Sequence, residues 1–259
     1  MKFYSYLIVF TAVFGFYPSA HAQYTDVINS NRPGASQSAF AVGTQVFQLE
    51  VGPYIVNEKR AIYPKYEVSG YGVDFAAHYG FWKEALELNI QGTFQNDTQT
   101  FSSLTTVENK RSNFKSLNFG AKYLVYDPHK NKDDQPNVYS YHANRGFKWS
   151  SLIPAVSVAA GVNYDTPDNP YTAAAVEGLS YRGVLITQNN FSGGWVFITN
   201  FMLDRIGSDQ TDFQYILTLT HSFDPKWVVF GETQGISSDF YADNLFRIGG
   251  GYLLSKDLQ

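Results

Sequence analysis

One stretch of strictly alternating sequence constrains the fold of this chain most strongly. Between Asp212 and His221 apolar and polar residues alternate, and Ile216 is the one apolar residue on the polar side. A turn at Phe223–Lys226 and a second run from Trp227 to Gly235 follow. A period of two indicates a β-strand with two different faces. Because about 9–11 residues are enough for a tilted strand to cross a bilayer, we predict one hairpin of a transmembrane β-barrel here.

The same alternation recurs along most of the chain and predicts an all-β, antiparallel, up-and-down transmembrane β-barrel. The predicted strands are Thr44–Val56, Val68–Tyr79, Glu84–Phe94, Phe114–Tyr126, Trp149–Val162, Tyr181–Asn190, Trp195–Leu203, Asp212–His221, Trp227–Gly235 and Leu245–Leu254. Polar loops are expected at Asn57–Lys65, Asn96–Asn113, Asn163–Ser180, Asp204–Gln210 and Ile236–Asn244. Short turns join the strands at the other end, and the long polar stretch Asp127–Lys148 is the exception.

The strand count bears on whether the barrel is complete. Ten strands are present, and Leu258-Gln259 after the turn Ser255–Asp257 reads as the start of an eleventh. Single-chain bacterial barrels have an even number of strands and close on themselves, since an unpaired edge is not tolerated in lipid. We therefore expect ten strands of a twelve-stranded barrel whose C-terminal end is missing. A ten-stranded barrel with a short tail is the alternative.

The first residues form an export signal. Lys2 precedes an apolar run, Tyr6–Tyr17, and Pro18 is followed by the A-x-A cleavage pattern Ala20-His21-Ala22. The apolar run is too short for a membrane anchor. We expect a signal peptide at 1–22, a periplasmic N-terminal extension at 23–43 and an outer-membrane barrel at 44–259.

Composition agrees with a barrel in the outer membrane of a Gram-negative cell. Aromatic residues make up 17% of the chain, as barrels with aromatic girdles at both membrane interfaces require. The absence of cysteine is ordinary in a bacterial envelope and excludes cysteine metal sites and thiol catalysis. A net charge of −4 gives no sign of nucleic-acid binding. The expected partners are outer-membrane lipid, the barrel assembly machinery and a small solute of unknown identity.

Charged residues fall on the polar, inward face of the predicted strands. These candidates for lining the lumen are Glu50, Asp74, His78, Glu87, Lys122, Glu232 and Arg247. On the lipid face a Lys or Arg would cost about 2–4 kcal/mol at the midplane. A soluble lipocalin-like barrel would carry apolar residues inside, so these charges argue against that class. Lys122 is expected to reach toward Glu87 and Glu50 and to narrow the lumen.

The residues needed for catalysis do not form a recognisable motif. The predicted mature chain has the histidines His78, His129, His142 and His221, and no G-x-S-x-G nucleophile motif. His78 is expected in the lumen with Asp74 and Glu87 nearby, so an oriented base remains an alternative. Acidic residues lack the spacing of metal ligands. We predict that the protein is not an enzyme and has no cofactor or metal.

Several short motifs resemble those of an outer-membrane barrel family called "putative MetA-pathway of phenol degradation". They are Thr25-Asp26 with Asn31-Arg32-Pro33-Gly34, Phe47–Gly52, Asn118–Tyr123, Phe230-Gly231-Glu232 and Gly249–Ser255. The chain departs from the family by the insertion Val27–Ser30 and by lacking the closing strands. The resemblance spans the mature chain and implies an outer-membrane barrel with a role in transport, without specifying the solute.

The sequence therefore predicts an outer-membrane channel or transporter for small solutes, with hydrophobic or aromatic compounds as one class. Two alternatives remain at this point. The first is a barrel with a structural or assembly role and no transported solute. The second is an outer-membrane enzyme that modifies lipid.

Overall fold

A computed structural model describes residues 34–102, 106–128, 149–172, 176–224, 226–239 and 242–254. Its elements are β1 (Phe47–Arg60), β2 (Tyr66–Gly80), β3 (Leu86–Ser102), β4 (Thr106–Tyr126), the 3-10 helix η1 (Trp149–Leu152), β5 (Ala155–Asp165), β6 (Gly178–Phe191), β7 (Trp195–Ile206), β8 (Asp212–Ser222), β9 (Trp227–Ser238) and β10 (Ala242–Tyr252). The predicted signal peptide, the Thr25–Pro33 motif, most of the Asp127–Lys148 connection and the turn Ser255–Asp257 lie outside the described residues.

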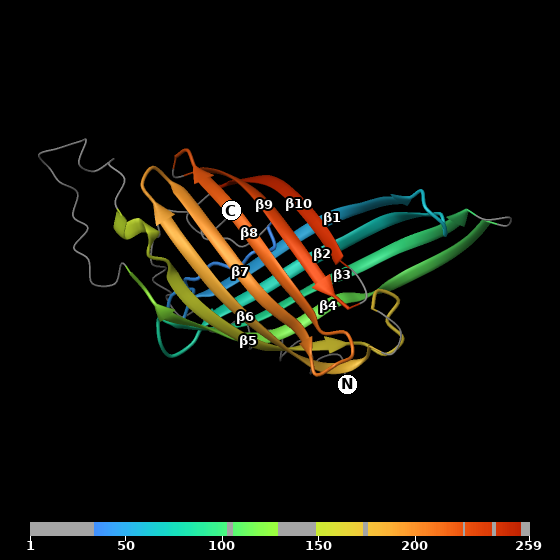
Figure 1. Ribbon diagram of the computed structural model, residues 1–259, viewed down its shortest axis with the longest axis horizontal. Helices are drawn as coiled ribbons and strands as arrows, with labels where there is room; N and C mark the ends of the chain where they lie inside the picture. Colours follow the sequence, from blue (N-terminus) through green and yellow to red (C-terminus); the bar gives the residue numbers. More distant parts are fainter. Residues whose placement is uncertain are drawn as a thin grey trace, which may run out of the picture.

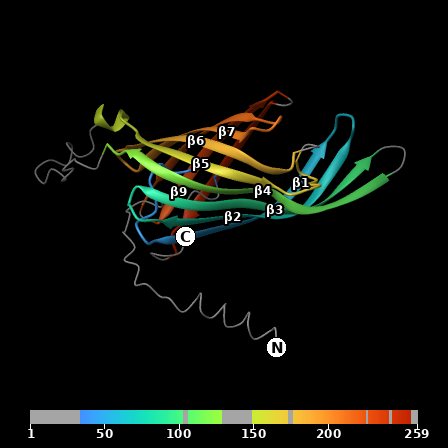
Figure 2. The same cartoon turned by 90° about the horizontal axis from the view of Figure 1, so that it is seen from below.

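The ten strands form one antiparallel sheet in which each strand pairs with the next in sequence order. The sheet curls into a half-barrel, with β5–β9 facing β1–β4 across a concave interior (Figure 1, Figure 2). This confirms the predicted all-β, up-and-down architecture. β1 and β10 are the edges of the sheet, and no ladder joins them within the described ranges. Twelve strands remain a prediction. In the same ranges, no helix has the length and apolar character needed to span a membrane.

The two faces of the sheet differ in chemistry as the alternation predicted. The outer face exposes large apolar side chains such as Leu49, Phe119 and Leu219, which are 62%, 47% and 46% accessible. The inner face carries polar and charged residues that are almost fully buried, among them Glu87 and Lys122. An exposed apolar surface of this extent indicates an interface with a membrane or another protein rather than with water.

Most predicted strand ends differ from the observed ones by a few residues, and two boundaries were wrong by more. The predicted loop Asn96–Asn113 is a continuation of β3 and β4, which are 17 and 21 residues long and exceed the length needed to cross a bilayer. Neither face of these two strand extensions is apolar, so the sequence there has no hydrophobic periodicity that would indicate a strand. Figure 1 shows this hairpin, drawn in green, projecting beyond the rest of the sheet. The predicted strand Trp149–Val162 begins later, at Ala155, because η1 and then Pro154 precede it.

At the opposite end of the sheet short turns connect the strands, except between β4 and β5. Gly193 and Gly194 connect β6 to β7, both with φ of +80°, a conformation that glycine adopts without strain. Gly194 also accepts a hydrogen bond at 2.9 Å from the Ser222 amide of β8. The predicted turn Phe191–Gly194 is thus held by the neighbouring strand.

Candidate functional site

An extended stretch of main chain crosses the interior of the half-barrel. We call residues 35–42 the inner segment; they lead into β1 from the end of the sheet with the short turns. The inner segment pairs with no strand, so its buried amides and carbonyls need other partners. Side chains on the inner wall of β3 to β9 supply them. The predicted extension 23–43 therefore has its described part in the concave interior, and its side of the membrane stays a prediction.

A carboxylate on β9 holds the beginning of the inner segment. Both oxygens of Glu232 accept from the Ala35 amide, at 3.0 and 3.1 Å, and Oε2 also accepts from the Ser36 amide at 3.1 Å. Thr218 and Arg247 donate to the same carboxylate, each at 2.9 Å. Glu232 thus has an ion-pair partner on the wall and two main-chain donors from the inner segment.

Amide and hydroxyl groups hold the middle of the inner segment. Asn200, which is fully buried, accepts from the Gln37 amide at 2.6 Å and donates to the Gln37 carbonyl at 3.0 Å. Gln188 accepts from the Ala39 amide at 3.0 Å and from the Ser38 hydroxyl at 2.9 Å. The Ser157 hydroxyl donates to the Ala39 carbonyl at 2.5 Å. These contacts bind the main chain of the inner segment, as a neighbouring β-strand would. The partner groups, however, are side chains of the wall rather than the main chain of a strand.

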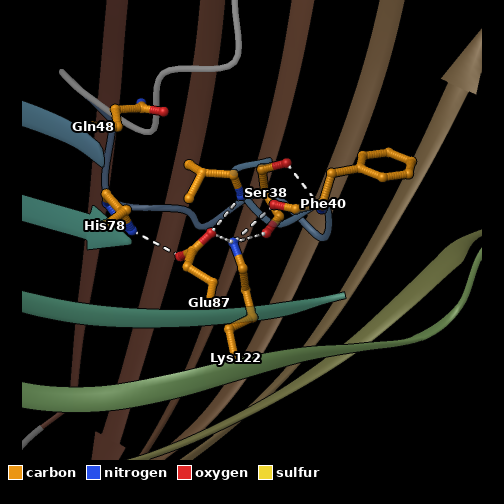
Figure 3. Close-up of a pocket in the computed structure, with 7 residues that line it drawn as sticks. Ser38, Phe40, Gln48, His78, Glu87 and Lys122 are labelled. Carbon is orange, nitrogen blue, oxygen red and sulfur yellow. Dashed lines mark hydrogen bonds and ion pairs between the residues drawn. The ribbon is translucent and has the colours of Figure 1, made fainter. Parts of the chain in front are cut away.

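A buried cluster of charge holds the end of the inner segment (Figure 3). The Lys122 ammonium donates to the Ser38 and Phe40 carbonyls at 3.0 and 2.9 Å and pairs with Glu87 at 3.1 Å. Glu87 also accepts from the Val42 amide at 3.0 Å, and its other oxygen lies 2.8 Å from His78 Nδ1. All three side chains are at most 2% exposed. The carboxylate is therefore occupied by a cation, an imidazole and a main-chain amide.

Very little free space remains beside this cluster. A cavity of about 10 Å³ lies between the inner segment and β2–β4, with His78, Glu87, Lys122 and Gln48 in its lining, room for about one water molecule. His78 Nε2 is buried and has no hydrogen-bond partner among the described residues. The cavity is too small for an organic substrate.

An apolar patch on the inner wall lies against the same segment. Ala39 packs into a buried cluster made of Ala155, Val184, Ile186, Met202 and Ile216. These side chains belong to β5–β8 and point inward, where a water-filled lumen would call for polar groups. Ile216, the exception in the alternating stretch of β8, is thereby explained as a member of the buried apolar cluster that includes Ala39 of the inner segment.

The structure places the predicted site residues in two groups and separates the others. His78, Glu87 and Lys122 meet at the end of the inner segment, and Glu232 and Arg247 meet at its beginning. Glu50 is buried on the inner face and accepts from Gln48 at 2.7 Å, while Asp74 accepts from Thr93 at 2.5 Å. His78 pairs with Glu87 rather than Asp74. Sequence reasoning missed Asn200, Gln188 and Ser157. The apolar residues that point inward on the same strands were an available signal that this part of the wall is covered.

A second polar network lies near the opposite opening. The loop between β5 and β6 turns inward so that the Tyr171 hydroxyl donates to the main-chain carbonyls of Gln95 and Arg111 at 3.1 and 3.2 Å. Arg111 pairs with Asp97 at 2.7 Å and lies 5.1 Å from the Tyr171 ring centre. Burial, together with the charge of Asp97, raises the pKa of Tyr171 to about 12. The phenol therefore remains a hydrogen-bond donor at neutral pH.

No group of three or more potential metal-ligating side chains occurs within the part of the chain that the structure describes. The acidic residues of the inner face are instead spread along the wall, and those at the inner segment have cationic partners. The arrangement can hold a peptide main chain.

A comparison with known families decides the classification. The model of the family described as "Putative MetA-pathway of phenol degradation" matches residues 30–259. The chain belongs to this family. The resemblance inferred from the short motifs is thereby confirmed, and the match covers all the strands and the inner segment. No curated protein matches the chain.

Proposed function

We propose that this protein is an outer-membrane β-barrel of a Gram-negative cell that conducts small solutes across that membrane. One observation carries the proposal: apolar side chains occupy the outside of a curled antiparallel sheet and charged side chains the inside. Outer-membrane barrels have this distribution because lipid solvates one face and a polar interior the other. Membership of the family supports the barrel and leaves the solute open.

Other features support this location and its partners. The outer face provides the contact with outer-membrane lipid, and the predicted signal peptide provides export. Insertion by the barrel assembly machinery follows for any such barrel. The apolar patch at Ile186, Met202 and Ile216, which Ala39 covers in this structure, would favour hydrophobic or aromatic compounds among small solutes.

Planar lipid bilayers provide the test. The purified mature protein, refolded in detergent and confirmed as folded by its heat-modifiable migration, is expected to give stepwise currents. Swelling of liposomes in small sugars or aromatic acids would then rank solutes. Absence of both currents and swelling, with folding confirmed, would favour a structural or assembly role.

Because the inner segment fills the interior, the alternative of a structural or assembly role also has support. A wall whose polar groups are satisfied by the chain itself, as Glu232 and Asn200 are, needs no solute. We propose that the protein is not an enzyme, since the His78–Glu87 pair borders a cavity too small for an organic substrate. A lipid-hydrolase activity that is lost on His78→Ala would overturn this.

A further inference from the structure

The inner wall of β3–β9 contains a built site for an extended peptide main chain. Its polar groups match the inner segment in order along the chain: Glu232 with Ala35 and Ser36, Asn200 with Gln37, Gln188 with Ala39 and Lys122 with Phe40. Each wall residue named is either a buried charge or a buried amide. Buried polar groups are costly unless they are hydrogen-bonded, and the inner segment, which covers this wall, also supplies the hydrogen bonds that its polar groups need.

We infer that the inner segment is a plug that binds this site and closes the barrel, and that its release opens the conducting path. The inference rests on the proposed channel function and adds to it the closed state and the groups that maintain it. The inner segment reaches from Glu232 on β9 to Glu87 on β3, so it crosses most of the curled sheet. Ala39 covers the apolar patch around Ile216, which would otherwise face water.

The interactions suit a plug that can leave. The partners of the main chain are separate side chains, each hydrogen-bonded to one or two main-chain groups of the inner segment, rather than a continuous ladder. The wall charges keep a partner without the plug: Glu87 retains Lys122 and His78, and Glu232 retains Arg247. Departure of the inner segment therefore leaves no isolated charge, which would be the costly outcome.

The site also defines what the opened path offers a solute. Release uncovers Asn200, Gln188 and Ser157 beside Ile186 and Ile216. A polar row and an apolar patch would then lie on one wall. A small amphipathic solute matches that surface better than a fully apolar or highly charged one.

Thiol accessibility tests the position of the plug independently of conduction. The chain has no cysteine, so Ser38→Cys introduces a single thiol at a residue 5% exposed, and Thr44→Cys places one at an exposed residue. In the refolded full mature chain, a bulky hydrophilic thiol reagent should modify Thr44→Cys rapidly and Ser38→Cys slowly. Adding Asn200→Ala should speed modification at position 38 about 30-fold, the ratio expected for two lost hydrogen bonds of ordinary strength.

A matched control separates loss of the plug from general loosening of the wall. Asn118→Ala removes another buried inward asparagine, which donates to Asn163 at 3.0 Å rather than to the inner segment. It should leave modification at position 38 slow. Equal acceleration by both variants, or rapid modification in the Ser38→Cys protein alone, would overturn the plug.

Conductance tests the gate. Ser38 Oγ and Gln188 Oε1 lie 2.9 Å apart, so a short bifunctional methanethiosulfonate should lock Ser38→Cys/Gln188→Cys in place. Locking should abolish the open events, a reductant should restore them, and Asn200→Ala should increase them; the single Ser38→Cys protein treated alike is the control. Equal currents in the locked and reduced states would overturn the plug while the channel stands. No current from any variant, Asn200→Ala included, with position 38 protected, would overturn the channel and with it the gate.

Discussion

Lys122 has two structural roles in this interior. It forms an ion pair with Glu87 and donates hydrogen bonds to the main chain of the inner segment. The sequence placed both on the inner face and predicted their approach, because both alternate with apolar residues on adjacent strands. It did not predict that Lys122 would donate to two carbonyls of the inner segment. That segment lacks periodicity, and a contact 84 residues apart in sequence leaves no local signal. The register was therefore predictable and the partner was not.

Breaking this buried ion pair should cost more than removing it entirely. Lys122→Met leaves the Glu87 carboxylate buried without its ammonium partner, which should destabilise the fold by about 3–5 kcal/mol. Glu87→Gln/Lys122→Met removes both charges and should recover most of that loss. Urea unfolding of refolded protein in detergent, followed by tryptophan fluorescence, measures both. A double variant as unstable as the single one would mean that the ion pair is not the source of the effect.

Tyr171 is the residue whose ionisation should be visible in stability. Its raised pKa, about 12 in the fold against about 10 in an unfolded chain, means that folding favours the neutral phenol. The contribution is fully present below pH 10 and is lost as the pH rises toward 12. Wild-type protein should therefore lose more stability between pH 9 and 12 than Tyr171→Phe does. Parallel losses in the two proteins, measured by urea unfolding at each pH, would contradict this assignment.

At the scale of elements, hydrophobic alternation located strands well and their ends poorly. The ten predicted strands all exist, since each has a membrane-length stretch with an apolar face. The β3–β4 hairpin continues past this stretch through Gln95 and Asn113, where both faces are polar. Strand pairing persists there through the ladder and through Arg111–Asp97, neither of which produces a hydrophobic period.

Arginine scanning along this hairpin should locate the membrane within it. Ile90 and Val107 both belong to the β3–β4 hairpin and are 42% and 53% exposed, but Val107 lies in the projecting part. Ile90→Arg should destabilise the inserted protein by about 2–4 kcal/mol, as at a bilayer midplane, and Val107→Arg by about 0–1 kcal/mol. Refolding titrations in lipid vesicles measure the difference. Equal penalties would place the projecting hairpin in the bilayer or exclude the bilayer from both positions.

At the scale of the whole molecule, the two ends of the sheet differ, and under the proposed function this difference predicts which side of the membrane each end faces. One end has the tight connections such as Gly193-Gly194, and the other has the projecting β3–β4 hairpin and the inward-turned loop of Tyr171. Barrels of this class carry short turns on the periplasmic side and longer connections outside. The inner segment enters from the end with short turns, because Gln45 donates to the Gly80 carbonyl at 2.9 Å.

Cysteine labelling of intact cells should reveal this sidedness. Glu108 on the projecting hairpin and Lys226 in the β8–β9 turn are both exposed. A reagent that does not cross the outer membrane should label Glu108→Cys in whole cells, and Lys226→Cys only after that membrane is permeabilised. Because the chain has no other cysteine, the unmodified protein is the blank. Labelling of Lys226→Cys but not Glu108→Cys in whole cells would reverse the orientation and would make the inner segment a plug that enters from outside.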